Sequence, residues 1–383
     1  MRILFAAPAY WPSSAFGGPI SVMRELARGL VARGHAVDVV TSSLTDLESS
    51  PPRRGRVEQV DGARVHYLPT PLRYRWMGIT PSVWRELDGL DRPDLVHVFG
   101  FRDFVGTISS AWARRRRVPY VFEGLGMVRP KLRKVALKRA LDASLYRPVL
   151  RGAGLLLAAS RVEAVEYSGA GAPASRIVVR PNGFPAPAPP AARPGPLRRR
   201  LGLDAATPLV LSVGRIARGK GLDLLVRALA DLPEAHLAIV GPDDRHGVHA
   251  ELVALRSALG LERRVQLLGP WPAAGAPPLE LFADADVSAL VSAHENFGMV
   301  AAEAAAAGTA SLVSDRCGIA ELVRDRAALV VPYELEPARE ALRRLLGDDE
   351  LRASLGRGGR ELAGELSWAE VVSQQERIYE RLA

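Results

Sequence analysis

Short apolar runs alternate with longer amphipathic stretches along most of the chain. The runs have the length of β-strands and fall at residues 2–7, 37–40, 65–68, 95–99, 120–122, 154–158, 177–179, 209–213, 236–240, 265–268, 287–291, 310–313 and 328–331. Most of them are continuously apolar, which is typical of parallel strands buried on both faces. Helical stretches lie between them, so the pattern predicts an α/β fold with doubly wound, parallel sheets.

A proline-rich segment divides this series of strands in two. Residues 184–196 read FPAPAPPAARPGP, a composition that predicts a stiff linker. The 383 residues are too many for one ordinary hydrophobic core and suit two domains of similar size. We therefore expect two Rossmann-like domains, residues 1–183 and residues 197–367, that face each other across a cleft. Ligands are expected at the carboxyl ends of the strands.

The composition is that of a globular protein, with 48% hydrophobic and 24% charged residues. The first residues, MRILFAAPAYWP, are too briefly apolar for a signal peptide, and no apolar run reaches 18 residues. We therefore expect a cytoplasmic chain without a transmembrane segment. The single cysteine, Cys317, excludes an internal disulfide and a cysteine-based metal cage, and the seven histidines show no metal-ligand spacing.

The net charge of +9 favours an anionic partner such as a nucleotide, a phospholipid surface or a nucleic acid. Residues 114–117 are four consecutive arginines, and residues 131–139 hold three lysines and two arginines. These stretches are either a solvated basic helix face or a surface that docks on anionic lipid at the inner face of a membrane. No zinc-finger or helix-turn-helix pattern accompanies the charge, so we expect no nucleic-acid partner.

One strand leads through a polar loop into an alanine-rich helix, residues 299–307, that Gly308 ends. The start of such a helix presents free backbone N–H groups and the positive end of its dipole, which suits a phosphate. Glu295 lies in the loop and Glu303 about one turn inside the helix. Carboxylates there can accept hydrogen bonds from sugar or ribose hydroxyls. The alternative is that both are solvated charges on a surface helix.

A second glycine-rich segment follows the strand at residues 209–213. Gly214, Gly219 and Lys220 have the G-x4-G-K spacing of a P-loop, which makes a nucleotide hydrolase an alternative. A P-loop needs a serine or threonine after the lysine to bind magnesium, and Gly221 has no hydroxyl. The chain holds only four lysines, so Lys220 stands out as a functional candidate.

The loop after the first strand ends in Gly17 and Gly18, at the start of a helix. Backbone at such glycines can receive an anion or let a substrate approach closely. The loop lacks the G-x-G-x-x-G fingerprint, so it gives little support to a dinucleotide site.

Several of these motifs occur together in one family. Glu295 and Glu303 are separated by seven residues that include an FG pair, and a Gly-x-x-Glu element follows at residues 318–321. Together they resemble the E-x7-E signature of retaining GT-B glycosyltransferases of family 4, the glycosyl transferases group 1. Three further segments are similar to motifs of that family: GGPISV at residues 17–22, RPNG at residues 180–183 and GR-x4-KG at residues 214–221.

The resemblance implies a GT-B fold in which a C-terminal helix, here within residues 368–383, returns to pack on the first domain. It implies a hexosyltransferase that uses a nucleotide diphosphate sugar, for which we expect UDP, without a metal or another cofactor. The acceptor would be a sugar, a lipid-linked glycan or a small natural product. A P-loop-like nucleotide hydrolase and a non-catalytic protein that binds nucleotide sugars are the alternatives.

The resemblance also implies roles for single residues. In the family, the arginine and lysine that match Arg215 and Lys220 grip the donor diphosphate. The glutamates that match Glu295 and Glu303 meet the donor sugar and the ribose, so Arg215, Lys220 and Glu295 are the catalytic candidates. The donor contacts implied in this way are Gly18, Gly241, Leu268, Asn296, Phe297, Gly298, Met299, Val300 and Glu303.

One position departs from the family. Many relatives carry a histidine near the reacting carbon, after the strand at residues 120–122, and this chain has Leu125 there. A backbone group, His97 or Glu123 would then take the role, although either side chain could equally be structural. Gly17, His97, Glu123 and Leu125 are therefore the candidates for the acceptor side.

Overall fold

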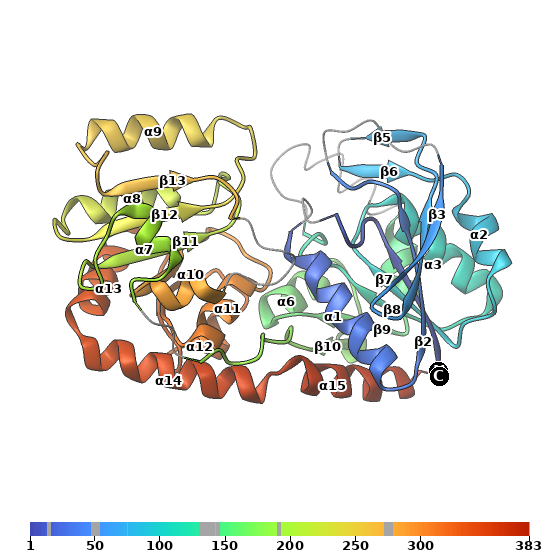
Figure 1. Ribbon diagram of the computed structural model, residues 1–383. Coiled ribbons are helices and arrows are strands. Elements are labelled where there is room, and N and C mark those ends of the chain that lie inside the picture. The colour runs from blue at the N-terminus through green and yellow to red at the C-terminus, as the bar shows by residue number, and fades with distance from the viewer. Residues whose placement is uncertain are drawn as a thin grey trace. The chain divides into compact units, whose positions relative to one another are not determined.

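The computed structural model describes residues 1–13, 17–46, 54–74, 76–129, 142, 146–189, 193–271 and 279–382. The chain forms two compact units, one made of Met1–Asn182 with Trp368–Ala383 and the other of Gly183–Ser367. We call them unit 1 and unit 2 and describe each by itself (Figure 1).

Unit 1 is built on a sheet with the strand order β10-β9-β8-β7-β1-β2-β4-β3. Neighbouring strands are parallel except at the edge, where β3 runs antiparallel to β4. The strands are β1 (Arg2–Ala7), β2 (Ala36–Ser42), β3 (Arg56–Val60), β4 (Ala63–Leu68), β7 (Leu95–Phe99), β8 (Tyr120–Glu123), β9 (Leu155–Ala158) and β10 (Ile177–Val179), and the separate hairpin is β5 (Leu72–Tyr74) and β6 (Met77–Ile79). The helices are α1 (Gly18–Ala32), α2 (Val83–Gly89), α3 (Phe104–Arg116), α5 (Arg147–Gly152), α6 (Arg161–Gly169), the 3-10 turn η3 (Ala174–Arg176) and α15 (Trp368–Glu380).

Unit 2 has a fully parallel sheet with the order β13-β12-β11-β14-β15-β16. Its strands are β11 (Leu209–Val213), β12 (His236–Val240), β13 (Val265–Leu268), β14 (Val287–Leu290), β15 (Ala310–Ser314) and β16 (Ala328–Val331). Its helices are α7 (Pro196–Leu201), α8 (Leu222–Ala230), α9 (Val248–Ala258), α10 (Leu279–Asp284), α11 (Met299–Ala307), α12 (Ala320–Val323), α13 (Leu335–Gly347) and α14 (Asp349–Glu365). The prediction of two Rossmann-like, doubly wound α/β sheets is confirmed.

The strands that the sequence did not predict are β3, β5 and β6. β3 is exposed or half-exposed along its whole length, so it shows neither a continuous apolar run nor a clear alternation. β5 and β6 are three residues each, below the length at which periodicity is informative. The apolar runs found the buried parallel strands and missed these exposed ones.

The alanine-rich helix α11 is buried rather than lying on the surface. Six of its alanines are buried, and the helix packs on α10, α14 and the sheet. Close approach to α14 depends on small residues, because a Cβ at Gly359 would lie 3.0 Å from the carbonyl oxygen of Ala305. α11 is therefore not a solvated surface helix, and Glu303 is a half-exposed residue on it.

The C-terminal helix α15 packs on α1 within unit 1 (Figure 1). Gly29 permits the close approach, since a Cβ there would lie 2.5 Å from Val372 Cγ2. At the rim of the contact, the Glu376 carboxylate accepts hydrogen bonds from Arg33 and lies 2.8 Å from His35 Nε2.

A buried polar cluster joins α15 to the centre of the unit 1 sheet. His97 Nδ1 and the Tyr379 hydroxyl share a hydrogen bond of 2.6 Å. His97 Nε2 lies 3.3 Å from Glu123 Oε2, which accepts a hydrogen bond of 2.7 Å from Arg180. Burial opposes ionisation of Glu123, but the Arg180 guanidinium and His97 hold the pKa of its carboxyl below the ordinary value. Within the cluster, the Glu123 carboxylate and the Arg180 guanidinium form a fully buried ion pair.

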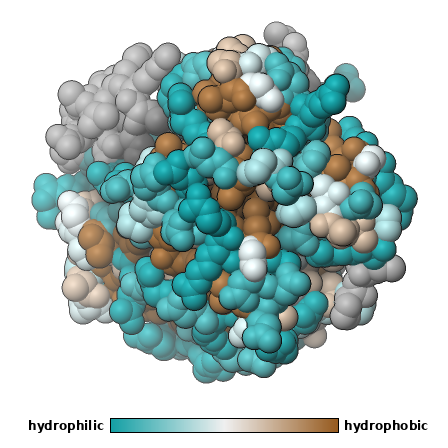
Figure 2. Space-filling view, turned by 90° about the vertical axis from the view of Figure 1, so that its left-hand side faces the viewer, coloured by the Kyte–Doolittle hydropathy of each residue, from teal (hydrophilic) through white to brown (hydrophobic). Residues whose placement is uncertain are grey.

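The face of unit 2 in Figure 2 is mostly hydrophilic, with hydrophobic residues in smaller areas between the polar ones. The apolar side chains of this unit gather on the two faces of its sheet instead, around Val210 and Leu229 on one side and Leu211 and Phe282 on the other. This packing on both faces holds the strands of the sheet, and with them the loops at their ends, in fixed positions.

We predict that Glu123→Gln destabilises the protein by about 3 to 5 kcal/mol, because it leaves the buried Arg180 guanidinium without a carboxylate. Urea denaturation followed by circular dichroism measures this change. The control is Glu365→Gln, which breaks an exposed pair with Arg326 and should cost less than about 1 kcal/mol. Equal effects of the two substitutions would contradict the buried ion pair.

Candidate active site

The candidate site of unit 2 lies where the order of its strands reverses. β11 has β12 on one side and β14 on the other, so the loops that leave β11 and β14 diverge at their carboxyl ends. Open parallel sheets bind their ligands at such a switch point. Arg215 and Lys220 follow β11, and Glu295 follows β14. The topology therefore brings the three catalytic candidates to one edge of one sheet.

Glycines let the loop after β11 press against its neighbours. Gly221, the residue that precedes α8, has φ 63°, and a Cβ there would lie 1.9 Å from the carbonyl oxygen of Val291. No side chain fits at this position. A serine or threonine that binds magnesium is therefore excluded by space as well as by sequence, which argues against a P-loop.

The carboxyl ends of β12 and β13 lie near the same loop. Gly241 has φ 151°, and a Cβ on it would lie 2.0 Å from the carbonyl oxygen of Gly214. The Gly241 N–H donates to the carbonyl of Leu268, and the Gly214 N–H donates to that of Val240. Of the two predicted donor contacts, Gly241 thus lies against the glycine that precedes Arg215, and Leu268 is hydrogen-bonded to Gly241.

The loop after β14 is held on both sides by backbone hydrogen bonds. The Ala293 N–H donates to the carbonyl of Gly219 at 2.7 Å, which ties it to the loop after β11. Glu295 and Phe297 accept from the N–H groups of Gly318 and Ile319 at 3.0 and 2.7 Å. Three loops from neighbouring strands therefore form one connected rim.

Lys220 and Glu295 form an ion pair across this rim, with 2.5 Å between Nζ and Oε2. Their side chains are 28% and 23% exposed, so a ligand can reach both. Arg215 is exposed and lines the same small pocket as Lys220, together with the backbone of Gly214. The sequence placed Arg215 and Lys220 together on a diphosphate but did not reveal the pairing of Lys220 with Glu295.

Glu303 lies in α11, within the second turn from Gly298, which caps the helix with φ 112°. Burial raises the pKa of its carboxyl to about 8, and no opposite charge lowers it. Around the helix start, Asn296, Met299 and Val300 are half-exposed. The Phe297 ring is buried against Phe184 at a centroid distance of 6.4 Å, so at this residue only the backbone faces the rim.

The candidates of unit 1 fall into two groups. Gly17, with φ 82°, precedes α1, and the exposed Gly18 begins it, so both stand at a helix start after β1. His97 and Glu123 belong to the buried cluster and are 0% exposed. Neither side chain is exposed at the surface, which favours the structural interpretation of both.

Leu125 occupies a strained turn after β8. Its φ is 52°, an uncommon value for a bulky side chain, and Gly126 follows with φ 75°. The turn is fixed from α6, because Glu163 accepts a hydrogen bond of 2.6 Å from the Gly126 N–H and Tyr167 one of 2.7 Å from the Gly124 N–H. The sequence did not point to Glu163 or Tyr167, since nothing but the fold brings α6 to this turn.

Of the two basic stretches, only the first lies among the described residues. Residues 114–117 are exposed at the end of α3, and residues 131–139 lie outside the described residues. None of the helices that the structure describes is long and apolar enough to cross a membrane. In the described part of the chain, no group of three or more His, Cys, Asp or Glu side chains is placed to hold a metal ion.

Comparison with protein families gives two matches that together span most of the chain. Residues 196–362 match the family of glycosyl transferases group 1, and residues 17–183 match the glycosyl transferase 4-like domain. The boundary between the two matches falls in the proline-rich segment.

Among curated proteins, the chain is similar to several D-inositol 3-phosphate glycosyltransferases. The enzyme of Xylanimonas cellulosilytica is 30% identical over 416 aligned positions, which cover 99% of this chain and 95% of that enzyme. The enzyme of Corynebacterium aurimucosum is 36% identical over 201 positions, 48% of this chain and 45% of the enzyme.

Solved structures match the fold over the full length. The Anabaena protein Alr3699/HepE in complex with UDP and glucose has a TM-score of 0.78 at 21% identity, with all of both chains covered. The sucrose-phosphate synthase of Thermosynechococcus elongatus has a TM-score of 0.77 at 23% identity, over 100% of this chain and 98% of that one. The GT-B architecture is thereby confirmed.

The raised pKa of Glu303 predicts a pH-dependent stability. Its proton stabilises the folded state fully below about pH 4.5, and this contribution is lost as the pH rises to about 8. The variant Glu303→Gln lacks this loss, so its advantage in melting temperature over the wild type should grow by at least roughly 2 °C between pH 5 and pH 8. Thermal unfolding without ligand measures it.

The exposed Glu280→Gln is the control for this measurement and should leave the difference constant. A constant difference for Glu303→Gln as well would contradict the burial of this carboxyl.

Proposed function

The chain belongs to the family of glycosyl transferases group 1 and is a glycosyltransferase, and we propose that it moves a hexose from a UDP-sugar to an acceptor hydroxyl with retention of configuration. We propose that Arg215 and Lys220 hold the diphosphate, Glu303 the ribose and Glu295 the transferred sugar. The proposed reaction requires no metal ion.

One observation carries the proposal. Arg215, Lys220 and Glu295 meet at the switch point between β11 and β14, with Lys220 already charge-paired at 2.5 Å. A guanidinium and an ammonium at one pocket are the groups that neutralise a leaving diphosphate.

The chemistry follows from where charge develops. As the bond from the sugar to the diphosphate breaks, negative charge grows on the leaving phosphate oxygen, and the two cations stabilise it more strongly than they stabilise the ground state. Lys220 turns from Glu295 towards the phosphate in this scheme. The Glu295 carboxylate is then free to accept hydrogen bonds from hydroxyls of the sugar. The acceptor hydroxyl forms the new bond to the sugar from the same face and gives its proton to the departing phosphate oxygen.

The choice of donor and acceptor draws on related proteins. HepE, which shares the fold, has been crystallised with UDP-glucose, which supports a uridine nucleotide. The curated relatives act in the glycosylation of D-inositol 3-phosphate according to their name, so a phosphorylated cyclitol is the first acceptor to test. Lipid-linked glycans and small natural products follow in that test.

The proposed function is tested with the purified protein and a panel of UDP-, GDP- and ADP-sugars, with and without D-inositol 3-phosphate and with EDTA throughout. We expect release of UDP from a UDP-sugar that persists in EDTA, because the cations that hold the diphosphate are side chains. Complete loss of turnover in EDTA that magnesium restores would contradict the proposal.

The proposed contacts of Arg215 and Lys220 with the diphosphate give a second prediction. Arg215→Ala and Lys220→Ala should each lower turnover by about a hundredfold, because a charge-assisted contact to the leaving group is strongest in the transition state. Arg218→Ala is a matched control, since Arg218 lies in the same loop but pairs on the surface with Glu251. Near wild-type rates for both test variants, or an equal loss for Arg218→Ala, would place the donor elsewhere.

A further inference from the structure

Unit 1 contains a large pocket at the edge of its sheet opposite to the carboxyl ends of the strands. Asp94 directly precedes β7, Tyr120 begins β8 and Gly154 directly precedes β9, and all three line it. The cavity measures about 690 Å³, which is within the usual size of small-molecule sites. Catalytic sites of parallel sheets lie at the other edge, so this pocket is separate from the active site.

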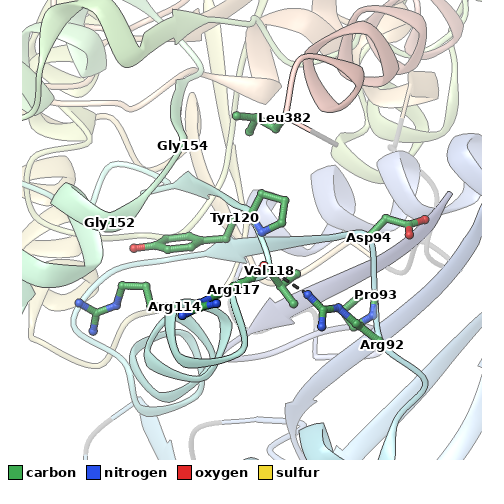
Figure 3. A pocket seen from close by; sticks show the side chains of 11 residues that line it. Arg92, Pro93, Asp94, Arg114, Arg117, Val118, Tyr120, Gly152, Gly154 and Leu382 are labelled. Carbon is green, nitrogen blue, oxygen red and sulfur yellow. Dashed lines mark hydrogen bonds between the residues drawn. The ribbon is translucent and has the colours of Figure 1, made fainter.

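Arginines dominate the charge of this pocket. Arg92, Arg114 and Arg117 line it, and Asp94 is the one carboxylate among the lining residues. In Figure 3 the three arginines lie on one side of the view and Leu382 on the other. None of the three forms an ion pair with a carboxylate among the described residues. Unpaired guanidinium groups around one cavity create a field that attracts anions.

Arg92 and Arg114 have contacts with groups other than acids. Arg92 donates through Nη2 to the carbonyls of Arg116 and Arg117, at 3.2 and 3.4 Å, which fixes its plane at the end of α3. Gly152 leaves room for Arg114, because a Cβ there would lie 2.7 Å from Arg114 Cδ. Each guanidinium has five N–H donors, so most donors of these groups stay available for a ligand.

We propose that this pocket is a second binding site, for a small molecule that carries phosphate groups. The Arg92, Arg114 and Arg117 guanidinium groups would bind the phosphate oxygens, for which their planar fork is suited. Pro93, Pro119 and the Leu382 side chain give the pocket an apolar wall, which would contact the body of the ligand. The same phosphate chemistry could be presented by a free metabolite or by a lipid headgroup, and the experiment separates the two.

The test uses inorganic pyrophosphate as the probe, titrated by calorimetry into the full chain at low salt. Because pyrophosphate would also bind at Lys220, all titrations use the Lys220→Ala background. We expect binding in that background, a loss of at least ~tenfold in affinity on adding Arg114→Gln with Arg117→Gln, and little change on adding Arg115→Gln with Arg85→Gln. The control pair removes the same charge from exposed residues that do not line the pocket.

Circular dichroism confirms that the variants fold. No binding in the Lys220→Ala background, or equal losses in the pocket and control pairs, would overturn the site for a free phosphate compound. Sedimentation with vesicles of phosphatidylcholine and phosphatidylglycerol then decides on the headgroup. Vesicle binding that depends on Arg114 and Arg117 but not on the control pair supports a headgroup ligand, and its absence alongside absent pyrophosphate binding overturns the proposal.

Discussion

The ion pair between Lys220 and Glu295 is the interaction on which the candidate active site depends. It connects the loop after β11 to the loop after β14, next to the backbone hydrogen bond from Ala293 to Gly219. A half-exposed pair of this kind contributes little to the free energy of unfolding, on the order of 0 to 1 kcal/mol. Its importance is positional, because each residue keeps the other at the rim, where the proposed donor diphosphate would compete for the ammonium.

In the proposed scheme, this competition couples binding of the donor diphosphate to release of the Glu295 carboxylate. A diphosphate that binds Lys220 would release Glu295 to the sugar, and departure of the diphosphate would let the pair form again. The proposed role of Glu303 also involves its charge, because the burial that raises its pKa to about 8 would have to be offset for its carboxylate to accept ribose hydroxyls. Both glutamates are therefore expected to change their electrostatic partners during one turnover.

Much of this arrangement could be read from the sequence because it depends on local patterns. Apolar runs located the buried strands, and the polar break before an alanine-rich helix located α11, which begins at Met299 and ends before Gly308 as predicted. Contacts between segments distant in sequence could not be read in this way. Lys220 and Glu295 are 75 positions apart, and the collision that excludes a side chain at Gly221 involves the carbonyl of Val291, directly after β14.

Unit 1 shows the same limit. His97 and Glu123 were candidates to replace the histidine that is missing at Leu125, yet they lie in a buried ionic cluster with Arg180 and Tyr379 that holds the C-terminal helix. The turn at Leu125, where many relatives have a histidine, is fixed instead by Glu163 and Tyr167. A positive φ at a leucine costs conformational energy, and these two hydrogen bonds are what maintain it.

The division of work between the two glutamates is the central claim, and calorimetric titration of UDP into Glu295→Gln and Glu303→Gln tests it most directly. Glu303→Gln should weaken UDP binding by roughly 1.5 to 3 kcal/mol, the range for hydrogen bonds to a charged group. Glu295→Gln should bind UDP at least as tightly as the wild type, because its substitution releases Lys220 to the diphosphate, while turnover falls. An equal loss of UDP affinity in both variants, or a loss in neither, would contradict the account.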